Sequence, residues 1–214
     1  MRQYFIILSF LFFNLAGFAQ GSGESRDILD RTYSDYIESG GIKLSFSNTT
    51  TEANGNVYDP QKGEAFIKGD KFRIEMDEMI IWFDGTTQWV LLTGLDEVNI
   101  SNPSETELAS VSPLALLGIY REGFDLNKPV LKTINEKVVY QIDMTPVSSK
   151  GDIKAISAAV DRKNNTLVQV TLTMSNNLQN KIDISNYNSN YKFIDNEFAF
   201  NKSKYPGVEV VDLR

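Results

Sequence analysis

The residue types that most enzymes use for nucleophilic and acid–base chemistry are scarce in this sequence. It contains no histidine and no cysteine, which excludes Ser-His and Cys-His nucleophile pairs and the commonest zinc ligand. The carboxylates of Asp77-Glu78, Asp84 and Asp96-Glu97 could form a glycosidase pair, but they fall in expected turns and strand ends, where solvated carboxylates are usual. Calcium binding at Asp77-Glu78 lacks EF-hand-like spacing. We therefore expect no catalytic residues, no bound metal and no cofactor.

The N-terminus has the composition of an export signal. Arg2 precedes an apolar run over residues 4–13, and Gly17-Phe18-Ala19 places small residues at the two cleavage-site positions. Such a run is too short for a stable membrane span. We expect residues 1–19 to be a signal peptide and residues 20–214 to form the single domain of an exported protein.

Charge and cysteine content limit the partners and the means of stabilisation. The formal net charge of −7 argues against nucleic acid and anionic membrane surfaces, which require a basic footprint, and favours a partner with a basic surface. Exported proteins often use disulfides. Without cysteine, this fold depends on its core alone.

Apolar periodicity predicts one helix followed mainly by strands. Over residues 26–39, apolar and aromatic side chains recur at spacings of three and four, which indicates an amphipathic helix that ends at Gly40-Gly41. From Ile42 onward the period is mostly two, with turns rich in Asn, Gly and Lys. This pattern lacks βαβ units and predicts a mainly β domain rather than a doubly wound α/β sheet.

One expected strand has an apolar face and a charged face. Residues 71–76 alternate charged and apolar side chains. We therefore expect Phe72, Ile74 and Met76 on a buried face and Arg73 on the opposite, solvated face.

The apolar run over residues 79–83 requires cover on both faces, because a strand that is apolar on both sides cannot leave either in water. The segment over residues 104–120 is the expected cover. Ser104 and Glu107 form a capping-box pattern at its start, and apolar side chains then recur with a helical period. Pro113 should divide it into two short helices, and we interpret it as a movable lid.

Six short motifs occur along the chain in an order that points to one family. They are the run from Ile67 to Ile74, Asp84-Gly85, Trp89, Asp96-Glu97, Phe198-Ala199-Phe200 and Tyr205-Pro206-Gly207-Val208. Together with the export signal and the absence of cysteine, they resemble the LolA family of outer-membrane lipoprotein carriers. The resemblance implies a mainly β (β+α) fold: an incomplete antiparallel β-barrel of about 10–11 strands, with an N-terminal helix and lid helices over an apolar cavity.

The resemblance also implies a function. LolA-like proteins are periplasmic chaperones that shelter lipoprotein acyl chains between the inner and outer membranes, and this one would be cleaved near Ala19-Gln20. The implied partners are acylated lipoproteins as cargo, an inner-membrane lipoprotein-releasing transporter and an outer-membrane acceptor, with the carrier a monomer. The residues expected to contact acyl chains are Phe46, Phe72, Ile74, Met76, Trp82 and Trp89 in the cavity and Leu114 and Leu117 in the lid.

The sequence departs from the family at one point and leaves alternatives open. Gly69-Asp70 stand where family members often carry an Arg-Pro pair whose Arg is associated with holding the lid closed, so the resemblance does not extend to that contact. Apolar rows such as the one at Phe72 are also what any sheet needs for its core. The same fold would suit a regulatory or sensor subunit, or a carrier of small lipids such as glycolipid, quinone or fatty acid.

Overall fold

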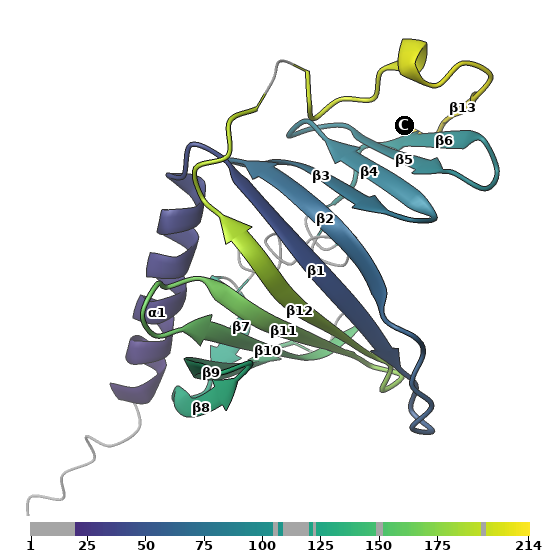
Figure 1. Ribbon diagram of the computed structural model, residues 1–214. Helices are drawn as coiled ribbons and strands as arrows, with labels where there is room; N and C mark the ends of the chain where they lie inside the picture. Colours follow the sequence, from purple (N-terminus) through teal and green to yellow (C-terminus); the bar gives the residue numbers. More distant parts are fainter. Residues whose placement is uncertain (1–19, 105–106, 109–119, 122, 149–151, 194–195) are drawn as a thin grey trace, which may run out of the picture.

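The computed structural model describes residues 20–104, 107–108, 120–121, 123–148, 152–193 and 196–214. This part of the chain forms one α-helix and a 13-stranded sheet (Figure 1). The expected signal peptide and the expected lid residues Leu114 and Leu117 lie outside the described residues.

The strands form one large sheet that curls without closing (Figure 1). The helix α1 spans Gln20–Ile37. The strands are β1 (Ile42–Thr51), β2 (Gln61–Lys68), β3 (Lys71–Met76), β4 (Met79–Phe83), β5 (Gln88–Leu92), β6 (Glu97–Ser101), β7 (Phe124–Leu126), β8 (Val130–Ile134), β9 (Lys137–Pro146), β10 (Ile153–Asp161), β11 (Leu167–Met174), β12 (Gln179–Asn188) and β13 (Glu209–Asp212), and a short 3-10 helix, η1, spans Lys202–Lys204. Their order across the sheet is β13-β6-β5-β4-β3-β2-β1-β12-β11-β10-β9-β7, with β8 also paired to β9.

This topology confirms the predicted mainly β class and the open, barrel-like sheet. Every pair is antiparallel except β13, which runs parallel to β6. The sheet has more strands than the prediction because β7 and β13, with 3 and 4 residues, are too short for alternation to reveal them. The helix begins at Gln20, six residues before the periodic stretch at Arg26, since helix ends carry weak sequence signals.

The helix α1 packs against one face of the sheet, which we call the inner face. Its buried residues, at helical spacing, are Ser25, Ile28, Leu29, Thr32 and Tyr36. Ile28, Leu29 and Tyr36 join the main hydrophobic core with inner-face residues of most strands. At the start of the helix, the Ser25 hydroxyl also donates to the backbone carbonyl of Asn127 at 2.5 Å, which ties α1 to the end of β7.

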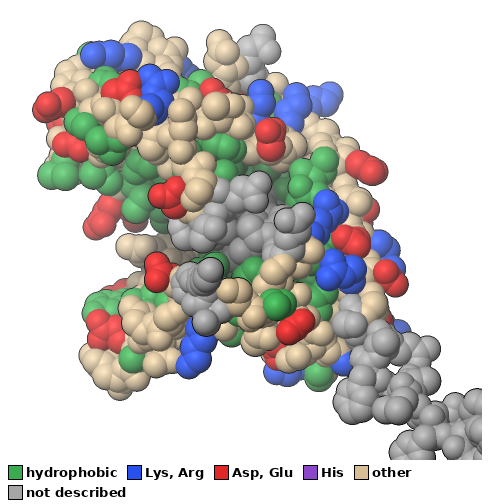
Figure 2. Space-filling view, turned by 180° about the vertical axis from the view of Figure 1, so that it is seen from behind, with side chains coloured by type: hydrophobic (Ala, Val, Ile, Leu, Met, Phe, Trp, Pro, Cys, Tyr) green, Lys and Arg blue, Asp and Glu red, His purple; other side chains and the backbone are tan. Residues whose placement is uncertain are grey.

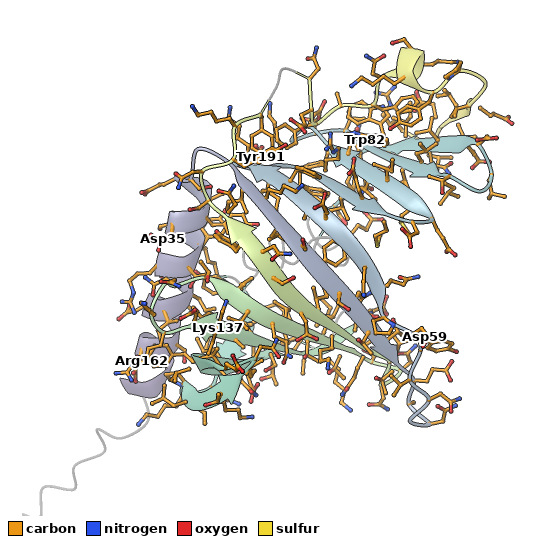
Figure 3. All side chains as sticks on the ribbon, viewed as in Figure 1. Asp35, Asp59, Trp82, Lys137, Arg162 and Tyr191 are labelled. Atoms are coloured by element: carbon orange, nitrogen blue, oxygen red, sulfur yellow. The ribbon has the colours of Figure 1, made fainter. Side chains whose placement is uncertain are left out.

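The opposite, outer face of β3–β6 is covered by the C-terminal segment, which we define as the described residues 189–193 and 196–208. The rings of Phe200 and Tyr205 are stacked with centroids 5.5 Å apart, and each meets Trp82 of β4 edge-on, at 5.6 and 5.7 Å. Figure 3 labels Trp82 and Tyr191, which lie on the side of the sheet that carries this segment. This segment therefore covers the outer side of the run over residues 79–83, and most of the cover expected from residues 104–120 lies outside the described residues.

Arg73 lies beneath the C-terminal segment. Its position on the face opposite Phe72 was predicted correctly, but the expectation that this face is solvated was wrong. The guanidinium lies over the Phe66 ring at 4.2 Å, and its Nη1 pairs with Glu197 Oε1 at 3.1 Å. The side chains of Arg73 and Glu197 are only 19% and 5% exposed, so this ion pair fastens the segment to the sheet.

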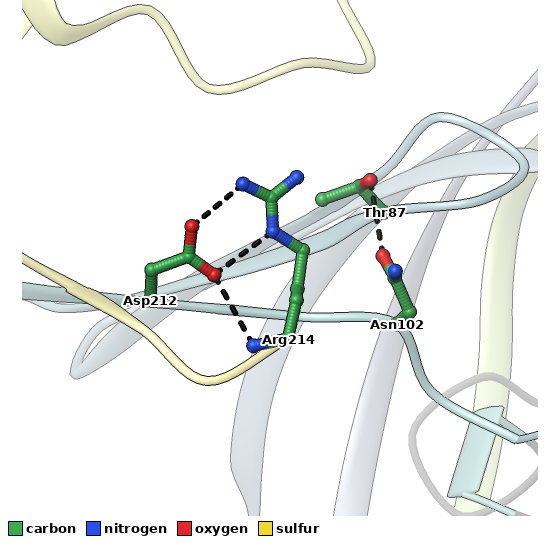
Figure 4. A network of polar contacts seen from close by, with 4 residues as sticks. All are labelled: Thr87, Asn102, Asp212 and Arg214. Atoms are coloured by element: carbon green, nitrogen blue, oxygen red, sulfur yellow. Dashed lines mark hydrogen bonds and ion pairs between the residues drawn. The ribbon is translucent and has the colours of Figure 1, made fainter.

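The C-terminus adds the parallel strand β13 to the edge of the sheet. Beyond it, Arg214 binds the Asp212 carboxylate through Nη2 at 2.6 Å and Nε at 2.9 Å (Figure 4). These hydrogen bonds lower the pKa of Asp212 to about 2. In the neighbouring part of the sheet, the Thr87 hydroxyl donates to Asn102 Oδ1 at 3.2 Å.

Candidate functional site

Part of the inner face is apolar but only partly buried. Seven hydrophobic residues there pack against the main core and keep some exposure, and we call them the inner apolar surface: Phe46, Met76, Met79, Val90, Ile153, Met174 and Ile182. Figure 2 shows a hollow on the back of the molecule with hydrophobic side chains along its wall. A patch of this kind marks a place where an apolar ligand or partner can bind.

Four of the six predicted cavity residues lie on the inner face. Phe72 and Ile74 are buried in the main core, at 4% and 2% exposure. Phe46 and Met76 belong to the inner apolar surface. The structure therefore brings all four residues to one face. Phe72 and Ile74 lie beneath its surface, and Phe46 and Met76 lie on it. Contact of these residues with an acyl chain stays a prediction.

The two tryptophans lie on the other face. Trp82 pairs with Arg73 in β3 and with Trp89 in β5, and directly paired residues share a face. Trp82 and Trp89 accordingly belong to the outer cluster beneath the C-terminal segment. The sequence analysis placed them with Phe72 because residues 79–83 are all apolar, so alternation cannot tell which face each one takes.

Phe46 is positioned by a glycine across the sheet. It is paired with Gly63 of β2, which is in turn paired with Met76 of β3. A Cβ atom at Gly63 would collide with the Phe46 ring and with a β3 backbone carbonyl. Glycine at position 63 thus leaves room for the Phe46 ring to lie across β2.

The two ends of the expected lid segment are described. The capping box is confirmed: the backbone N–H and the hydroxyl of Ser104 each donate to Glu107 Oε2 at 2.7 Å, and the Glu107 N–H donates back to the hydroxyl at 3.4 Å. The two donors at Ser104 lower the pKa of Glu107. Leu108 then packs against the main core, so the segment enters the inner face.

Three tyrosines lie between α1 and the inner face. Tyr120, at the far end of the lid segment, is fully buried and donates to Asp30 Oδ1 of α1 at 2.5 Å. Burial, followed by that hydrogen bond, raises its pKa to about 12. Burial raises the pKa of Tyr187 to about 12, with Asp35 adding to the shift. Burial also raises the pKa of Tyr36 well above its usual value.

The inner face becomes polar near the β1–β2 hairpin. Asn48 and Thr50 of β1 lie on the same face as Phe46, and Thr50 donates to Asn180 Oδ1 of β12 at 2.9 Å. Gln61 of β2 is paired with Asn48. We call Asn48, Thr50, Gln61 and Asn180 the polar end of the inner face.

A groove of about 260 Å³ borders this polar end. Its lining residues are Asp59, Pro60, Gln61, Lys62, Met76, Asp77, Glu78 and Met79. It connects Gln61 of the polar end with two methionines of the inner apolar surface. Its charged lining is mainly acidic, with three carboxylates and one ammonium group.

The described residues hold no cluster of three or more acidic, histidine or cysteine side chains that could bind a metal ion. Among the same residues, no helix is both long and apolar enough to cross a membrane. Of the acidic residues considered as catalysts, Asp77 and Glu78 lie in the β3–β4 turn and Asp84 follows β4, whereas Asp96 and Glu97 lie where the β5–β6 turn meets β6.

Sequence comparison assigns the chain to a family. Residues 15–176 match the family described as outer membrane lipoprotein carrier protein LolA. The chain belongs to this LolA family. The match covers the helix, the lid segment and the strands through β11, so all eight predicted site residues fall inside the part shared with LolA proteins. A search of curated proteins finds no match.

Two solved structures share the fold at low identity, and a third is similar at a lower TM-score. An uncharacterized conserved protein from Thermus thermophilus has a TM-score of 0.59 and 10% identity, covering 88% of this chain and 99% of its own. A DUF1329 family protein from Desulfovibrio piger has a TM-score of 0.52 and 11% identity, covering 86% and 99%. A LolA superfamily protein from Nitrosomonas europaea has a TM-score of 0.47 and 10% identity, covering 82% and 97%.

Several residues of the inner apolar surface were missed by the sequence analysis. Met79, Val90 and Met174 belong to the inner apolar surface but were not named, nor was the polar end. For Met174, strict alternation in its strand was a usable signal. Met79 begins the apolar run over residues 79–83, where periodicity carries no information about the face.

Proposed function

We propose that this LolA-family chain is a periplasmic carrier of lipoproteins that shelters their acyl chains on the inner apolar surface, and that it acts by binding without catalysis. The observation that carries the proposal is the contrast between an outer face whose central Trp82 is buried under the C-terminal segment and an inner face whose apolar surface stays partly exposed. Family membership supports the choice of ligand class.

The magnitude of acyl burial supports a carrier that releases its cargo only to another apolar site. Burying an acyl chain of about 16 carbons at ~0.8 kcal/mol per CH₂ gives on the order of 10 kcal/mol before ordering costs. Escape into water would then be very slow, so release requires an acceptor. The proposed partners are an inner-membrane transporter as donor and an outer-membrane receptor as acceptor.

The methionines support binding of chains that differ in shape. Met76, Met79 and Met174 on the inner apolar surface are unbranched, and Met144 is buried in the main core. A flexible thioether adapts to an irregular apolar ligand at little cost. The outer cluster, by contrast, is built from tryptophan, phenylalanine and tyrosine rings, which suit a fixed contact.

Native mass spectrometry with a triacylated lipoprotein tests the proposal. The protein is incubated with the acylated lipoprotein and, in parallel, with the same lipoprotein stripped of its acyl chains. We expect a one-to-one complex with the acylated form alone. Equal binding of both forms, or of neither, would contradict acyl-dependent carriage.

The alternatives appear as distinct outcomes of the same experiment. A small-lipid carrier would arrive with glycolipid, quinone or fatty acid bound, which the native mass of the purified protein would reveal. A regulatory or sensor subunit would bind a protein partner whether or not that partner is acylated. Either result would replace the carrier function proposed here.

A further inference from the structure

The polar end of the inner face carries polar groups without charges. Asn48, Thr50 and Gln61 share the Phe46 face because the β1–β2 register is continuous, and Asn180 is paired with Thr50. Side chains alternate along each strand. The charged neighbours on these strands therefore point to the outer face; they are Lys62, Lys181 and Asp183. The inner face thus combines an apolar stretch with a neutral, hydrogen-bonding end.

One atom of this polar end is buried without a partner. Among the described residues, Asn48 Oδ1 is shielded from water and accepts no hydrogen bond. Such an orphaned group costs stability, so native proteins seldom keep one without a reason. Asn48 lies opposite Ile182 of the inner apolar surface and remains partly exposed as a residue.

The charges around the polar end select against an anionic group. The bordering groove of about 260 Å³ is lined by Asp59, Asp77 and Glu78, with Lys62 as its single cation. A carboxylate or phosphate entering there would meet like charge and would find no guanidinium or ammonium group on the inner-face residues of the polar end.

We infer that the polar end binds the uncharged head of an acyl ligand, with the Asn48 amide accepting a hydrogen bond from a hydroxyl or amide of that head. The acyl tail lies on the inner apolar surface beside it. This inference rests on the proposed acyl binding and adds the class of head group: an uncharged hydroxyl or amide rather than a free carboxylate or phosphate.

Displacement of a fluorescent acyl probe by three ligands with the same palmitoyl chain tests the inference. They are 1-monopalmitoylglycerol, which has hydroxyl donors, methyl palmitate, which has none, and palmitate, which is anionic. We expect the protein to bind monopalmitoylglycerol about tenfold more tightly than methyl palmitate, the effect of one hydrogen bond to a buried, unpaired acceptor. Palmitate should bind more weakly than monopalmitoylglycerol.

Variants at two adjacent positions separate binding from structure. Asn48→Leu should bind monopalmitoylglycerol and methyl palmitate equally, and it should raise the midpoint of thermal unfolding because an unpaired buried carbonyl is removed. Thr49→Val, on the outer face, should retain the wild-type preference. A lower unfolding midpoint in Asn48→Leu would mean that Asn48 serves the fold, which overturns the inference.

The outcomes also distinguish this inference from the proposed function. Equal affinity of the wild-type protein for all three ligands would overturn the head-group inference while acyl binding stands. Failure of every ligand to displace the probe would overturn acyl binding, and the inference with it.

Discussion

The inner and outer faces of β3–β5 are built from the same strands but closed in different ways. On the outer face, Trp82 meets the stacked rings of Phe200 and Tyr205 edge-on, and Arg73 pairs with the buried Glu197. On the inner face, flexible side chains such as Met76 and Met79 remain partly exposed. Rigid aromatic contacts suit a fixed intramolecular interface, whereas flexible unbranched side chains suit reversible ligand binding.

This difference predicts that outer-face substitutions will mainly change stability and inner-face substitutions will mainly change binding. Both faces are apolar, so composition alone does not separate them. The two faces differ in how far another segment of the chain covers them. A segment far along the chain covers the outer face, and the inner apolar surface keeps an accessible part.

The largest expected effect is that of Trp82→Ala. Removing the indole leaves a cavity beneath Phe200 and Tyr205, and we expect a loss of about 4 kcal/mol in the free energy of unfolding. Urea denaturation followed by far-UV circular dichroism measures it. Acyl binding by the folded fraction should persist. Loss of binding with unchanged stability would instead place Trp82 in the ligand site and break the comparison.

The next effect is that of Glu197→Gln. The substitution leaves the Arg73 guanidinium beneath the C-terminal segment without its buried counter-ion, and removing one partner of such a pair costs about 3 kcal/mol. Urea unfolding measures the cost, and limited proteolysis should show earlier cleavage in the C-terminal segment. Glu209→Gln, at an exposed position of β13, is the matched control. Equal stability of the two variants would show that the ion pair does not fasten the segment.

A smaller effect, mainly on binding, is expected from Met76→Lys. A charge on the inner apolar surface should weaken acyl binding by about 2 kcal/mol, because the ligand must lie against a solvated ammonium group. The unfolding free energy should fall by less than about 1 kcal/mol, since Met76 is partly exposed. Thr49→Lys puts the same charge on the outer face and should leave binding intact. Equal weakening by both variants would argue against a ligand on the inner face.

The smallest effect is confined to high pH. The pKa of Tyr187 is raised from 10.0 to about 12, so above pH 10 the unfolded chain loses a proton that the folded chain keeps. The stability from this group is therefore complete below pH 10 and is lost as the pH rises toward 12. Tyr187→Phe should reduce the fall in unfolding midpoint over this interval. An unchanged pH profile would mean that Tyr187 ionises equally in both states.

Much of the strand pattern could be predicted from alternation. In residues 71–76, charged and apolar side chains alternate without exception, and the structure places Phe72 and Arg73 on opposite faces as expected. The Ser104–Glu107 capping box could also be predicted from the sequence, because its hydrogen bonds join residues three positions apart. Local signals of this kind depend on nearby residues only.

The misplaced tryptophans show where alternation fails. Residues 79–83 are apolar at every position, so a period of two is absent and either face is possible for Trp82. The C-terminal segment that decides the matter lacks regular periodicity over most of its length. Its contacts with β4 join residues more than a hundred positions apart, such as Trp82 and Tyr205.

The sequence by itself determined the family, the mainly β class and the face of each strand that alternates. These properties follow from motifs and from the two-residue repeat of a strand. Only the tertiary structure decided that the C-terminal segment covers Trp82 on the outer face, that Arg73 pairs with the buried Glu197 and that Asn48 Oδ1 has no partner beside an apolar surface. Each of these depends on which distant segments meet, because burial and hydrogen bonding are properties of the packed chain.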